Sequence, residues 1–88
     1  PKDRDKVVAI AATYTNIKGI HELKTRYAAN KPFIQFHLEL DGNLTLYRSH
    51  EIADELMLAL LKEFPEAEIT IHQDPAGLEK NVKYRERI

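Results

Sequence analysis

The segment ITIHQDP, residues 69–75, ends in side chains that can bind a metal ion. Its β-branched residues predict a strand, in which successive side chains alternate between the two faces of a sheet. Ile69 and Ile71 then face a core, and His72 and Asp74 share the opposite face. Imidazole nitrogen and carboxylate oxygen are ligands of Zn(II) and of other divalent transition metals. The spacing therefore permits a metal site on the outer face of this strand.

A second segment, residues 33–41, places another histidine on an outward face. Apolar side chains occupy every second position, which predicts a half-buried strand, and His37 lies between them on the side away from the core. Residues two apart on one strand lie about 6.6–6.8 Å apart on one face, so His72 and Asp74 can reach one ion or two adjacent ions. The chain has four histidines and no cysteine, so a transition-metal site must use imidazole and carboxylate.

The other two histidines fit ordinary roles as readily as ligand roles. His21 lies in an alternating segment, residues 20–29, on the side of Leu23, which also fits a half-buried histidine. His50 lies at the edge of a predicted helix, and Asp54 one turn later can pair with it. A histidine on the solvent side of a strand is often only a polar surface residue. The residues alone therefore leave open both a metal site and an ordinary polar face.

Five elements have to position these side chains. Helical spacing of apolar residues predicts two amphipathic helices, and period-two alternation predicts three strands. Their order is helix 3–15, strand 20–29, strand 33–41, helix 45–64 and strand 67–74. This order favours an α+β sandwich in which a three-stranded sheet carries two helices on one face, similar to a shortened ferredoxin-like fold. Residues 76–88 show no clear period and are predicted to form a loose or only partly helical tail.

Length and charge restrict the possible partners. Eighty-eight residues make one domain, and its small core gains from a partner subunit or a bound metal. The 13 basic residues against 14 acidic ones give a net charge of -1, which argues against binding a nucleic-acid backbone. The longest apolar run, residues 56–61, is far shorter than the roughly 20 residues that span a bilayer, so we expect this piece to be soluble.

Catalytic motifs are not evident in the sequence. Ser49, His50 and Asp74 could be combined on paper into a hydrolytic triad, but no glycine-flanked nucleophile turn supports it. The chain has no His-Glu-x-x-His motif, and its three glycines form no phosphate-binding loop. We therefore expect a protein that is not an enzyme.

Four blocks of sequence, in order, resemble a known family. They are GIHELKTR at 19–26, PFIQFHLELDG at 32–42, SHEIADEL at 49–56 and FPEAEITIHQDP at 64–75. Together they are similar to the cytoplasmic C-terminal domain of cation diffusion facilitator transporters, and within that family to the ferrous-iron and zinc efflux pumps of bacteria. The resemblance covers roughly residues 5–75 with matching spacing between the blocks. Four separate blocks are far more specific than any single histidine.

The resemblance implies a metallochaperone-like αββαβ domain that forms a V-shaped homodimer and binds metal near the subunit contact. Zinc is the metal it favours, with Fe(II), Cd(II) and Co(II) as alternatives. The ligand positions of the family fall on five residues of this chain: His21, His37, His50, His72 and Asp74. The resemblance further implies that Asp74 bridges two ions and that His50 serves an ion shared with the other subunit.

The six-helix membrane part of such transporters is not present in this sequence. We therefore expect an excised or naturally separate regulatory domain, residues 1–75, followed by a tail at 76–88 that matches nothing in the family pattern. Its partners would be a second copy and the transmembrane domain of the same transporter, at the cytoplasmic face of the bacterial inner membrane. The leading hypothesis is a metal-sensing dimerisation module that biases the transporter between conformations. The alternative is an interaction module that works without metal.

Overall fold

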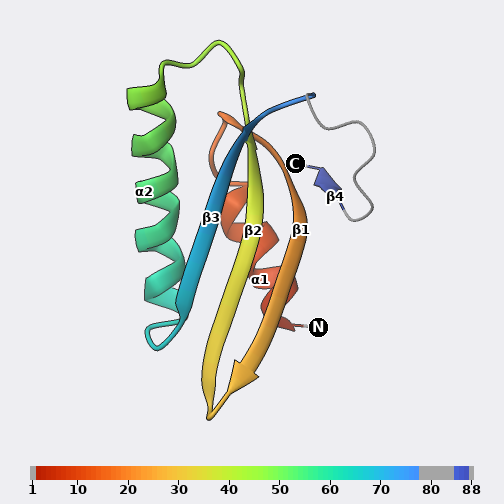
Figure 1. The fold of residues 1–88 in the computed structure, drawn as a ribbon, viewed down its shortest axis with the longest axis vertical. Coiled ribbons are helices and arrows are strands. Elements are labelled where there is room, and N and C mark those ends of the chain that lie inside the picture. Colours follow the sequence, from red (N-terminus) through yellow and green to blue (C-terminus); the bar gives the residue numbers. More distant parts are fainter. Residues whose placement is uncertain (1, 78–84, 88) are drawn as a thin grey trace.

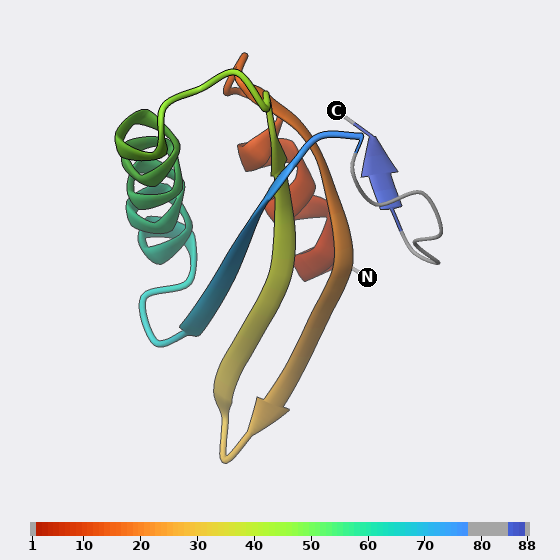
Figure 2. The same cartoon turned by 45° about the horizontal axis from the view of Figure 1, so that its top comes forward.

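The structure, a computed structural model, describes residues 2–77 and 85–87. Its elements are α1 (Lys2–Ala11), β1 (Ile17–Ala28), β2 (Lys31–Leu40), α2 (Leu46–Glu63), β3 (Glu68–Pro75) and β4 (Arg85–Arg87). In Figures 1 and 2, α1 lies behind the sheet and α2 runs alongside β3, and the two helices contact each other. The predicted α+β sandwich, with both helices on one face of the sheet, is confirmed.

The strands form one mixed sheet with the order β3-β2-β1-β4. β1 and β2 pair antiparallel, β2 and β3 pair parallel, and β2 is therefore paired along both of its edges. The three strands predicted from alternation are present. A fourth strand, β4, was not predicted. Arg85–Arg87 was expected to belong to a loose tail, but it pairs antiparallel with residues 19–21 of β1. A strand of three residues is too short to show an alternation pattern. The rest of the predicted tail from 78 onward, residues 78–84 and 88, lies outside the described residues.

The second helix supplies much of the core. The Thr45 hydroxyl caps α2 by accepting a hydrogen bond from the Arg48 backbone N–H, and the helix ends just before Phe64 and Pro65. Its buried stripe packs on the apolar side chains of the sheet. The core residues are Val7, Ala11, Ile17, Ile20, Leu23, Ile34, Phe36, Leu38, Leu40, Ile52, Ala53, Leu56, Leu60 and Phe64.

The first helix is shorter than predicted and β1 is longer. Both the backbone N–H and the hydroxyl of Thr13 donate to the Ile10 carbonyl, which closes the helix with a tight turn. β1 then starts at Ile17, which pairs with Leu40, and not at Ile20. The sequence signal failed here because Asn16 and Gly19 favour a turn, whereas Gly19 lies within the ladder.

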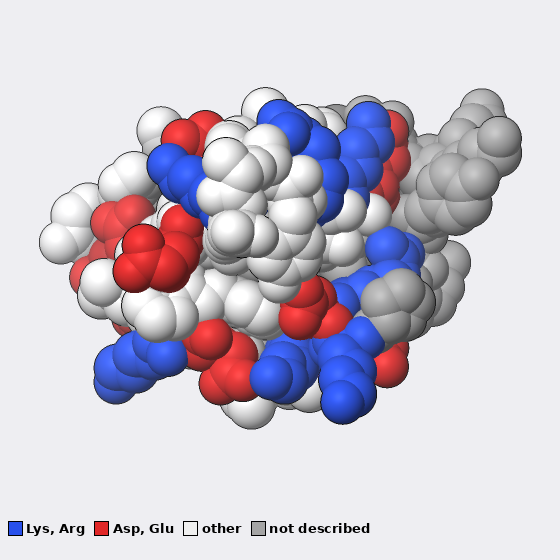
Figure 3. Space-filling view, turned by 90° about the horizontal axis from the view of Figure 1, so that it is seen from below, with Lys and Arg blue, Asp and Glu red and all other residues white. Residues whose placement is uncertain are grey.

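Polar contacts join α1 to β1. The Tyr27 hydroxyl donates to the Asp3 carboxylate at 2.7 Å, and this hydrogen bond raises the pKa of Tyr27 above its ordinary value. Arg4 donates to the Leu23 carbonyl at 2.9 Å. At the end of the molecule seen in Figure 3, Lys and Arg side chains are interspersed with Asp and Glu, so this face carries no continuous basic stripe.

We expect Leu60→Ala to lower the free energy of unfolding by about 2–5 kcal/mol, because it removes a fully buried side chain between α2 and the sheet. Leu58→Ala on the same helix is the control, since Leu58 is 64% exposed, and it should change the value by no more than about 0.5 kcal/mol. Urea unfolding followed by circular dichroism measures both. Equal losses would contradict this packing.

Candidate metal centre

An extra residue in β1 decides which face His21 occupies. His21 pairs with His37, and the next pair in the ladder is Lys24 with Gln35. Between these pairs β1 advances by three residues and β2 by two. Glu22 lies within this bulge and has φ +53°, a left-handed conformation that side chains seldom adopt. The bulge leaves Leu23 in the core and turns His21 to the opposite face. The prediction that His21 shares the side of Leu23 is therefore wrong, because alternation assumes an uninterrupted strand.

Three histidines lie side by side across the sheet. His21 of β1 pairs with His37 of β2, which pairs with His72 of β3. The ring centroids of each neighbouring pair are 4.7 Å apart with an interplanar angle of 20°. This spacing equals the distance of about 4.7–4.9 Å between hydrogen-bonded strands, so the strand register alone accounts for the stack. The outward orientation predicted for His37 and His72 agrees with this arrangement.

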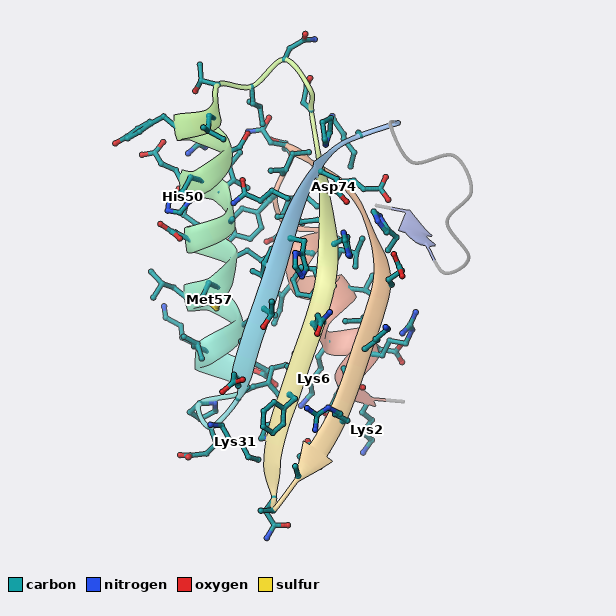
Figure 4. All side chains as sticks on the ribbon, viewed as in Figure 1. Lys2, Lys6, Lys31, His50, Met57 and Asp74 are labelled. Atoms are coloured by element: carbon teal, nitrogen blue, oxygen red, sulfur yellow. The ribbon has the colours of Figure 1, made fainter. Side chains whose placement is uncertain are left out.

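Two residue pairs further along the β2–β3 ladder, a carboxylate approaches the imidazoles. Asp74 pairs with Glu39, and in Figure 4 it lies toward the end of β3 that leads to the C-terminal segment. One oxygen of Asp74, Oδ2, is 2.9 Å from His37 Nδ1 and 3.4 Å from His21 Nε2. Ligands held about 2.0–2.2 Å from one tetrahedral ion lie roughly 3.3–3.6 Å from each other. The 3.4 Å distance lies within that range, whereas the 2.9 Å distance is that of a hydrogen bond between His37 and Asp74.

Among the described residues, His21, His37 and Asp74 form a group that could hold a metal ion, with one donor atom from each within 4.8 Å of the others. His21 is 1% exposed, whereas His37 and Asp74 are half-buried and open to solvent. Three protein ligands leave a fourth position of a tetrahedral ion for water or another group. The donor set and its geometry therefore fit a divalent transition metal.

The two remaining predicted ligands, His72 and His50, are not members of this group. The His72 ring stacks on His37 on the same face, and its side chain is exposed. His50 is on α2, which packs on the opposite face of the sheet, and its Nε2 is 3.3 Å from the Asp54 carboxylate. Figure 4 shows His50 well separated from Asp74. The helix pairing predicted for His50 and Asp54 is present.

Glu39 is a residue of the site to which sequence reasoning gave no role. Its Oε2 lies 2.8 Å from His21 Nδ1, and Glu39 is only 5% exposed. Glu22, in the bulge, has a carboxylate oxygen 4.0 Å from His21 Nε2. The available signal for Glu39 was its position two residues after His37, on the same strand face.

A model of the family described as "Cation efflux protein, cytoplasmic domain" matches residues 1–76. The chain belongs to this family. The resemblance drawn from the four sequence blocks is thereby confirmed, and the family groups transport proteins that are not enzymes in general. Among the described residues of this cation efflux domain, no helix combines the length and apolar character needed to cross a bilayer.

The cation efflux domain is similar to longer proteins along nearly its whole length. It is 58% identical over 87 residues to Protein p34 of Rickettsia rickettsii, covering 99% of this chain and 29% of that protein. It is 47% identical over 78 residues to the cation-efflux pump FieF of Pectobacterium carotovorum, covering 88% of this chain and 26% of the pump. The chain thus spans less than a third of the length of these relatives.

A solved structure has the same fold. The metal-bound C-terminal domain of the CzcD transporter from Thermotoga maritima superposes with a TM-score of 0.83 at 26% sequence identity. The match covers 90% of this chain and 93% of that one. The cation efflux domain described here therefore has the fold of a domain that has been observed with metal.

Deleting Glu22 should remove the bulge and turn His21 toward the core, because a one-residue slip moves a side chain to the other face of a sheet. We expect the deletion to abolish the nuclear Overhauser contact between the His21 and His37 rings, which are 4.7 Å apart in the structure. Glu22→Gly keeps the residue count and suits the left-handed backbone, so it should retain the contact. A deletion variant that keeps the ring contact would contradict the role given to the bulge.

Proposed function

We propose that this domain binds zinc through His21, His37 and Asp74 and that the bound ion regulates a cation efflux transporter from the cytoplasmic side. The observation that carries the proposal is the convergence of these three donors across three strands. The match to the cytoplasmic domain of cation efflux proteins supplies the context.

Zinc is the ion that this donor set suits best. Two imidazoles and one carboxylate match the nitrogen and oxygen ligands of tetrahedral zinc, and the chain has no thiolate that would favour softer ions. Fe(II), Co(II) and Cd(II) accept the same donors in different geometries and remain alternative ions. Since imidazole binds metal only when neutral, binding should release protons and weaken in acid.

A second ion fits beside the first in this proposal. A carboxylate has two oxygens, so Asp74 can bridge two ions while its Oδ2 faces His21 and His37. His72 stacks on His37 and shares the exposed face, which makes it the neighbouring donor for the second ion. Asp74 would thus connect the two ions, and His72 would complete the outer one.

We further propose that His50 acts in a homodimer. Its position on α2, across the sheet from the cluster, separates it from the site of its own chain. Large apolar side chains are exposed on the same helix: Leu46 is 86% exposed, Tyr47 76% and Leu58 64%. Such side chains mark surfaces that contact other proteins. A second copy docked there would bring His50 to an ion shared between subunits.

Regulation follows from linkage between the ion and the dimer. A ligand shifts a conformational equilibrium only by its difference in affinity for the two states. A zinc site completed by both subunits is tightest in one arrangement of the dimer and therefore favours that arrangement. In this proposal residues 1–75 are the dimerisation and metal-binding unit, located at the cytoplasmic face of the bacterial inner membrane. In a full-length protein the conformational shift would pass from this unit to the transmembrane domain.

Replacing ligands should weaken zinc binding selectively. We expect His37→Ala and Asp74→Ala each to lower zinc affinity by at least about tenfold in calorimetric titration. Replacing a residue that only orients a metal ligand already costs about 10–100-fold in affinity, so removing a ligand itself should cost no less. Thr70→Ala is the matched control, because Thr70 is exposed on β3 and lies two residues before His72. Wild-type affinity in both ligand variants would refute the site.

Zinc should also stabilise association of two copies. Sedimentation velocity is expected to show more dimer with zinc than with chelator, and His50→Ala should reduce that difference. Lys62→Ala, an exposed change elsewhere on α2, should leave it intact. The regulatory part of the proposal fails if association is the same with zinc, with chelator and in the His50 variant.

A further inference from the structure

Glu39 is a buried acid on the face of β2 that carries His37. It is 5% exposed, and a buried carboxylate is costly unless it is paired and hydrogen-bonded. Among its contacts is His21 Nδ1 at 2.8 Å, and His21 is itself 1% exposed. Across the β1–β2 ladder Glu39 faces Gly19, which contributes no side chain to that rung. The sheet thus directs a buried carboxylate at one nitrogen of one candidate ligand.

The two nitrogens of His21 have different neighbours. Nδ1 faces Glu39 at 2.8 Å, and Nε2 faces Asp74 at 3.4 Å. A carboxylate without a proton only accepts hydrogen bonds, so the 2.8 Å contact with such a carboxylate requires the proton on His21 Nδ1. In the neutral ring the lone pair then lies on Nε2, which points toward the metal-ligand group.

We propose that Glu39 is the positioning residue of the metal site: it holds the His21 proton on Nδ1 and so presents Nε2 to the ion. The inference rests on the proposed zinc function and adds a residue to it. A carboxylate behind a metal-binding histidine fixes its tautomer and ring orientation and makes it a stronger ligand. Glu39 is suited to this role because both side chains are buried and cannot exchange their contact for water.

In this proposal Glu39 contacts the His21 ring at Nδ1, on the side away from the ion, and is not itself a metal ligand. The two ring nitrogens of imidazole point in divergent directions, so a group bonded to Nδ1 does not share an ion held by Nε2. The donor atoms that the described residues bring within 4.8 Å of one another come from His21, His37 and Asp74, without Glu39. Glu22, by contrast, approaches His21 from the Nε2 side, at 4.0 Å.

The test uses nitrogen-15 NMR of the histidine rings together with zinc calorimetry. In the zinc-free wild type, His21 Nδ1 should carry a proton that exchanges slowly with water, and in the zinc-loaded protein Nδ1 should keep that proton while zinc binds Nε2. Glu39→Leu should lose the protected proton and bind zinc about 10–100-fold more weakly. Glu22→Gln removes a different carboxylate near His21, one on the Nε2 side, and should keep the protected proton.

The outcomes separate this inference from the proposed function. If the wild type fails to bind zinc, the function fails, whatever the state of the His21 ring. If the wild type binds zinc and Glu39→Leu binds it equally well, the function stands and the role of Glu39 is overturned. If Glu39→Leu does not fold, NMR of the wild type still tests the role of Glu39. A His21 Nδ1 without a proton, or zinc bound to Nδ1, overturns the inference.

Discussion

The register of β2 with its two neighbours is the constraint on which the candidate site depends. It aligns His21, His37 and His72 on one line across three strands and places Asp74 two residue pairs further along. The ring spacing of 4.7 Å is set by backbone hydrogen bonding and requires no special side-chain geometry. A slip of either neighbour by one residue would turn its ligands into the core.

The helices determine which face of the sheet is available to metal ligands. α1 and α2 cover one face of the sheet with apolar side chains, so polar ligands have only the other face available. The buried residues of β2 alternate with His37 and Gln35, and the same strand therefore anchors the core and carries the site. Glu39 is the exception, because it faces the site and is nevertheless buried.

Much of this arrangement could be predicted from the sequence, and the failures have local causes. Alternation correctly placed His37 and Asp74 because β2 and β3 pair in an unbroken parallel register. It misplaced His21 because a bulge leaves little trace in a hydrophobic pattern, and only the family resemblance kept His21 among the ligands. β4 was missed because its pairing is made by backbone over three residues. Alternation puts Glu39 on the same face as His37, but it carries no information about which nitrogen of a neighbouring ring a carboxylate meets.

The fourth strand also bears on how the sheet can grow. An unpaired strand edge is a template for strands of other chains, and proteins protect such edges with short covering strands, bulges and lysine or arginine side chains. β4 occupies the β1 edge at residues 19–21, the bulge at Glu22 interrupts it, and Lys24 and Arg26 follow along the exposed remainder. Extension of the sheet by a foreign strand is therefore disfavoured along this edge, beside the candidate metal ligand His21. Two copies meeting near β1 would have to recognise each other through side chains, a mode of contact that can open and close without unfolding either sheet.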